Sequence, residues 1–124
     1  MPIEINVDSE QGIVLVKTTD LVGVVDLSEV LESVLLIMQK QKLNKILVDA
    51  TALILLPTTM HLNWFASELS KHTKDLKHAI IISQQTSVGV SEIKKFAQNL
   101  GVNMQLFFSK DDAVSWLNQY GSIQ

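Results

Sequence analysis

Three polar residues whose side chains could act together on a phosphoryl group follow apolar runs of this chain. Asp49 and Ser83 each end one run, and Lys110 comes shortly after a third. Ligands of open α/β sheets bind beyond the carboxyl ends of the strands, where such groups can meet. Phosphoryl transfer to Asp49 would also need an acidic pair for Mg²⁺, which residues 17–20 (Lys-Thr-Thr-Asp) do not supply. We therefore expect Asp49 to accept backbone N–H bonds within its own loop.

The other residue types that carry chemistry form no site that the sequence can identify. The chain has no cysteine, which excludes disulfides, thiolate catalysis and cysteine-ligated zinc. His61 and His72 share one expected helix but lie about 16 Å apart along it, at a rise of ~1.5 Å per residue. The sequence contains neither a glycine-rich phosphate-binding loop nor a recognisable Ser-His-Asp arrangement. We expect no catalytic residues, no metal and no cofactor.

The charge of the chain argues against nucleic acid as a partner. The net charge is −3, and every positively charged side chain apart from histidine is a lysine. Arginine is the preferred group for bidentate phosphate and guanine contacts, so a nucleic-acid surface without one would be unusual. The residues Lys71, His72, Lys74, Lys77 and His78 form one modest basic cluster. We expect this cluster to be a solvated helix face and turn.

The sequence shows no targeting or membrane-spanning segment. Its first residues, Met-Pro-Ile-Glu-Ile-Asn, lack the basic and apolar regions of a signal peptide. The longest apolar stretches, residues 34–38 and 52–56, fall far short of the ~20 residues that span a bilayer. A cytoplasmic protein is the resulting expectation.

Hydrophobic periodicity predicts a single α/β domain over residues 1–124, in the order β-β-α-β-α-β-α-β-α, with a mixed, mainly parallel five-stranded sheet. Expected strands cover residues 3–8, 13–18, 46–49, 80–83 and 103–108. Expected helices begin near Asp26, at Thr58 or Thr59, before Ile93 and after Ser109. The first of them ends within residues 39–42, the second runs to about Lys74, and the third stops at Gly101. Ser109 and Asp112 have capping-box spacing.

An apolar connection, residues 52–57, is the feature hardest to explain as plain scaffold, because connections usually run over the surface and are polar. It could continue the sheet or pack beneath the second helix. It could pack against a second copy of the protein, since exposed apolar patches mark interaction sites. It could also line an apolar pocket. The candidate partner- or ligand-binding residues are Leu53, Ile54, Leu55, Leu56, Met60 and Trp64.

The element order and two local strings resemble the STAS domain of anti-sigma factor antagonists and their SpoIIAA-like, STAS/SEC14-like relatives. The first string is residues 45–51 (Lys-Ile-Leu-Val-Asp-Ala-Thr). The second is residues 107–117 (Phe-Phe-Ser-Lys-Asp-Asp-Ala-Val-Ser-Trp-Leu). The resemblance spans nearly the whole chain and implies the STAS fold.

The resemblance also implies a phosphorylation site at Thr58 or Thr59. In antagonist-type domains a partner kinase phosphorylates a serine in an Asp-Ser-Ser-Gly turn beyond the central strand. Counting eight residues from Asp49 reaches Pro57, so Thr59 falls at the phosphorylated position. Pro57 and Met60 stand where the family has Asp and Gly. The alternative is that either threonine simply caps the second helix.

These observations favour a non-enzymatic regulatory or protein-interaction module resembling an anti-sigma factor antagonist. Its implied partner is a protein, such as an anti-sigma-like kinase, and a homodimer is a further alternative. The second hypothesis is a binder of a small apolar or lipid-like ligand, which the SEC14-like resemblance implies.

Overall fold

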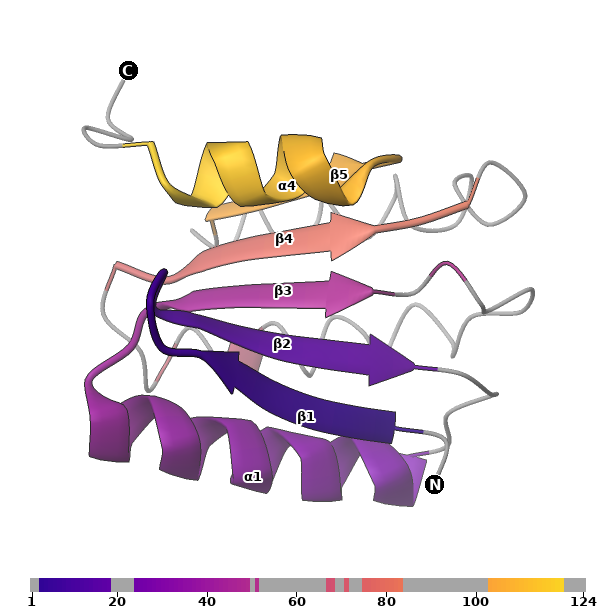
Figure 1. Cartoon of the computed structure of the whole chain (residues 1–124). Helices are drawn as coiled ribbons and strands as arrows, with labels where there is room; N and C mark the ends of the chain where they lie inside the picture. The colour runs from indigo at the N-terminus through magenta and orange to yellow at the C-terminus, as the bar shows by residue number, and fades with distance from the viewer. Residues whose placement is uncertain are drawn as a thin grey trace.

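The computed structural model describes residues 3–18, 24–49, 51, 67–68, 71, 75–83 and 103–119 (Figure 1). These residues form a five-stranded mixed sheet with one helix packed on each face. The strands are β1 (Ile3–Asp8), β2 (Ile13–Thr18), β3 (Lys45–Asp49), β4 (Lys77–Ile81) and β5 (Asn103–Phe107). The helices are α1 (Val24–Gln41) and α4 (Lys110–Leu117). The predicted α/β class and mixed five-stranded sheet are confirmed.

The strands lie in the sheet in the same order as in the chain, β1-β2-β3-β4-β5. β1 and β2 form an antiparallel hairpin, and β2 to β5 are parallel. The hairpin turn ends at Gly12, whose φ of 68° lies in the left-handed region that glycine enters without steric cost. The Gly12 N–H donates to the Asp8 carbonyl at 2.8 Å, which closes the turn predicted at residues 9–12.

Side chains alternate between the two faces of the sheet, and each face has its own core. The face toward α1 buries Val14 and Val16 of β2, Ile46 of β3, Leu76, and Val30, Leu31, Val34 and Met38 of the helix. The face toward α4 buries Ile13, Leu47, Ala79 and Ile81 of the strands together with Ala113 and Leu117 of the helix. The apolar stripe of α1 therefore follows the spacing that the sequence predicts.

Both described helices end or begin as their sequences suggest. α1 stops after Gln41, because Lys42 takes a left-handed φ of 57° and the Leu43 N–H bonds back to the Met38 carbonyl at 2.8 Å. α4 begins after Ser109, whose side chain accepts the Asp112 N–H at 3.4 Å. The predicted cap at Ser109 is confirmed.

Four helices were expected, and two are present in the part of the chain that the structure describes. Residues 67, 68 and 71 are also helical and fall within the second expected helix. The remainder of that helix and the whole of the third, before Gly101, lie outside the described residues. None of the described helices is long and apolar enough to cross a membrane.

The predicted surface position of Lys77 and His78 is wrong. β4 begins at Lys77, three residues before its predicted start, so both residues lie in a central strand. They are 7% and 3% exposed. Lys71, by contrast, is exposed and pairs with Glu68 at 2.8 Å, as expected for a solvated helix face. Lys74 and His72 lie outside the described residues.

Candidate functional site

The three strand-end residues singled out from the sequence do follow the same edge of the sheet. The register places Lys17, Asp49, Ile81 and Phe107 side by side at the carboxyl ends of β2 to β5. Ser83 comes two residues after β4, and Lys110 opens α4 three residues after β5. Parallel strands therefore bring the three residues to one edge, as expected.

The Asp49 carboxylate is engaged within its own loop. Its Oδ1 atom accepts the Thr51 N–H at 3.1 Å and the Thr51 hydroxyl at 2.6 Å. This is the loop role that the sequence predicted for Asp49, and it fixes the direction in which the chain leaves β3. Within the described residues no ion pair joins Lys110 to Asp49.

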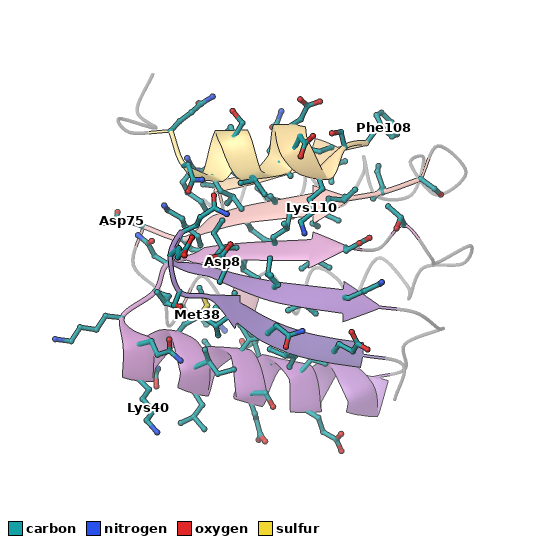
Figure 2. All side chains as sticks on the ribbon, viewed as in Figure 1. Asp8, Met38, Lys40, Asp75, Phe108 and Lys110 are labelled. Atoms are coloured by element: carbon teal, nitrogen blue, oxygen red, sulfur yellow. The ribbon has the colours of Figure 1, made fainter. Side chains whose placement is uncertain are left out.

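Lys110 faces another part of the molecule. It is exposed, and its positive charge is the smallest of the influences that lower the pKa of Asp8. The main cause of that lowering is the hydrogen bond from the Gln11 side-chain amide, at 2.8 Å. Figure 2 shows Lys110 and Asp8 on the side of the sheet that carries α4. The described neighbours of Asp49 and of Lys110 are therefore different residues.

The remaining predicted site residues lie outside the described part of the chain. They are the phosphorylation candidates Thr58 and Thr59, and the partner- or ligand-binding residues Leu53, Ile54, Leu55, Leu56, Met60 and Trp64. Asp49 and Thr51 mark where the chain leaves the sheet toward them.

A group of hydrogen-bonded polar side chains lies at the opposite end of the strands, at the amino ends of β3 and β4. Lys45 and Lys77 are register partners on neighbouring strands, and both side chains reach the C-terminal end of α4. The Lys45 ammonium donates to Asn118 Oδ1 at 3.2 Å and lies 3.5 Å from the Gln11 carbonyl. The Asn118 amide in turn donates to Gln11 Oε1 at 2.6 Å. We call these four residues the amino-end cluster.

Within this cluster, Lys77 caps α4. Its ammonium donates to the Trp116 carbonyl at 2.6 Å and to the Gln119 carbonyl at 3.4 Å. It also lies 4.6 Å from the centroid of the Trp116 ring, a cation–π contact, and that ring packs against Phe107 at 5.7 Å. The free carbonyls at a helix C-terminus carry partial negative charge, so a cation there is stabilising.

Two buried basic groups of β4 have shifted pKa values. Burial, and secondarily the positive charge of Lys45, lowers the pKa of Lys77 below its usual 10.5. Burial lowers the pKa of His78 from 6.5 to about 4, so this imidazole is neutral at neutral pH. His78 lies on the other face of β4, between its register partners Ile46 and Met104.

The chemistry of the amino-end cluster is that of a structural cross-link. Its two ammonium groups are directed at carbonyl and amide oxygens, and they hold the end of α4 and the β1–β2 turn against the strands. In the described part of the chain, no group of three or more His, Cys, Asp or Glu residues could hold a metal ion.

Sequence analysis missed this cluster because its members are ordinary polar residues far apart in the chain. One signal was available: a lysine precedes the apolar residues of two consecutive strands, at residues 45 and 77. In a parallel sheet such residues become neighbours.

Comparison of the chain with models of protein families, with curated proteins and with solved structures gives no match.

Proposed function

We propose that this protein is a non-enzymatic regulatory module of the STAS type, which binds another protein through residues 53–64, the segment that follows β3 in the sequence. The partner would be an anti-sigma-like kinase, and phosphorylation of Thr58 or Thr59 would change its binding. The architecture of a hairpin followed by parallel strands in chain order is compatible with this proposal.

The observation that carries the proposal is the turn at Asp49. A carboxylate at the end of a central strand is a natural catalytic group in an α/β protein. Here it accepts both donors of Thr51 and so orients the start of the following segment. The residue best placed for chemistry thus supports a loop, which favours recognition over catalysis as the role of this edge.

Phosphate on Thr59 is the most direct test. We expect the protein from its own host to contain a fraction heavier by one phosphate, which native mass spectrometry detects and fragmentation assigns to Thr58 or Thr59. We expect Thr59→Glu either to lose a partner that the unmodified protein retains or to gain a partner that the unmodified protein lacks. Thr73→Glu serves as a control, since it adds the same charge shortly before β4 rather than after β3.

Two results would overturn the proposal. One is equal retention of the same partner by wild type, Thr59→Glu and Thr73→Glu. The other is a lipid-sized mass that co-purifies with the protein in place of a protein partner, which would favour the apolar-ligand hypothesis.

A further inference from the structure

We propose that two copies of this chain pair through the outer edge of β5, forming an antiparallel two-fold contact centred on Leu106. The inference rests on the geometry of β5 and is independent of the proposed function. β1 and β5 are the two edge strands, and no residue in the described part of the chain pairs with the outer edge of either.

The direction of the backbone groups of β5 sets the possible contacts. The Ile82 N–H of the β4 side donates to the Phe107 carbonyl at 2.9 Å, so Phe107 points its backbone groups into the sheet. Backbone groups of successive strand residues alternate in direction. Met104 and Leu106 therefore direct their N–H and C=O groups away from β4.

Two two-fold registers of β5 pair the outward groups of Met104 and Leu106, one centred on Leu106 and one centred on Gln105. With Leu106 opposite Leu106 of the second copy, the two Leu106 residues form a hydrogen-bonded pair, in which both exchange N–H···O bonds, and the exposed Phe108 comes opposite Met104. A register centred on Gln105 would instead leave Phe108 opposite residue 102, beyond the start of β5.

The side chains fit the same register. Phe108 is 61% exposed, which is unusual for a large apolar side chain, and Leu106 is half-buried. Leu106 lies on the face shared with Met104, so pairing places apolar side chains beside apolar side chains. α4 is centred over β4 and touches β3 and β5 to a similar extent, so it sits one strand inside this edge.

Charge distinguishes β5 from β1, the other edge strand of the sheet. Residues 103–108 (Asn-Met-Gln-Leu-Phe-Phe) contain no charged residue and no proline, two of the devices that protect an edge strand from pairing. β1 carries Glu4 and Asp8, and a two-fold pairing of β1 would gather two carboxylates from each copy on one face. Self-association through β5 avoids that repulsion.

Sedimentation of the full chain over a range of concentrations tests the proposal. We expect reversible dimers, because an edge contact alone is smaller than a standard protein interface. Leu106→Pro should abolish them. The Leu106 N–H points outward, so proline there removes an intermolecular donor but no bond to β4. Circular dichroism confirms that the variant remains folded.

A matched pair of variants separates edge pairing from general hydrophobic association. Leu36 on α1 is 66% exposed and Phe108 is 61% exposed. Phe108→Lys should weaken the dimer by at least about tenfold, because it replaces an apolar contact with a charge. Leu36→Lys should leave the dissociation constant unchanged. Equal weakening by both variants would contradict the proposal.

The absence of cysteine from the chain allows a direct test of the register. In a hydrogen-bonded antiparallel pair the Cα atoms lie about 5.5 Å apart, within the range that a disulfide can bridge. Leu106→Cys should form a covalent dimer under mild oxidation, and Leu36→Cys should not. A chain that stays monomeric at every concentration, or a dimer that survives Leu106→Pro and does not cross-link at residue 106, would overturn the proposal.

Discussion

Polar side chains at the two ends of the parallel strands bond over very different distances along the chain. At the amino ends, Lys45 reaches Asn118, 73 residues away, and Lys77 reaches Trp116, 39 residues away. At the carboxyl ends, Asp49 bonds to Thr51, two residues away, and Ser109 accepts from Asp112, three residues away. The described bonds at the amino ends therefore join segments that are far apart in the chain, whereas these two bonds at the carboxyl ends are local.

Long-range and local bonds are expected to contribute differently to stability. Bonds between distant segments form only in the folded chain, so losing one affects global unfolding. Local bonds set the path of a connection and leave the rest of the sheet intact.

The largest expected effect concerns His78, the buried imidazole near the amino end of β4. Its pKa is about 4 in the folded protein and 6.5 when exposed, so only the unfolded chain binds its proton between these values. Stability should therefore fall by about 3 kcal/mol as the pH drops from 7 to 4. Urea unfolding across this range should give a shallower pH dependence for His78→Leu. Identical slopes for the two proteins would contradict the assignment.

The second effect concerns Lys77, which holds the end of α4. Lys77→Met keeps the apolar stem but removes the donor to the Trp116 and Gln119 carbonyls. We expect the free energy of unfolding to fall by about 2 kcal/mol, typical of a hydrogen bond to a charged group. Lys71→Met is the matched control, because its partner Glu68 forms an exposed helix pair that is worth at most about 0.5 kcal/mol. A similar loss in both variants would remove the distinction between the two lysines.

A smaller effect is expected at the carboxyl end, where Ser109 caps α4. Ser109→Ala should lower the free energy of unfolding by about 1 kcal/mol, because the Asp112 N–H loses its acceptor. Ser115, exposed on the same helix, provides the control, and its replacement by alanine should be neutral within about 0.5 kcal/mol. A cost at Ser109 greater than that at Lys77 would reverse the comparison between the two ends.

The smallest effect is expected at Thr51. Thr51→Val removes the hydroxyl donor to Asp49 but retains the backbone N–H bond. Because the residue is exposed, urea denaturation should show a change within about 0.5 kcal/mol. A much larger loss would show that the turn at Asp49 supports the core and not only its own loop.

The sequence predicted the local features of this protein well. Apolar spacing identified the α1 face, and the Ser109 cap and the Asp49 turn followed from short-range patterns whose partners lie within three residues. The strand order and register were not available from spacing alone. They decide which residues become neighbours, as Lys45 and Lys77 do.

The two errors of burial share one physical cause. Lys77 and His78 have polar side chains that are seldom fully buried, so their residue types predicted a surface position. Tertiary contacts reverse that preference: the end of α4 supplies oxygens for the ammonium, and the imidazole enters the core in its neutral form. The residues at 53–64 remain a prediction, since they lie outside the described part of the chain.

The agreement between strand order and chain order has a consequence for how the protein is made. Each strand emerging during synthesis can add to the growing edge of the sheet, without waiting for a later segment to be inserted between earlier ones. The bond from Asn118 to Gln11 is different, because it joins residues 107 positions apart. This contact between the hairpin turn and the end of α4 therefore forms only once synthesis has reached the segment that contains Asn118.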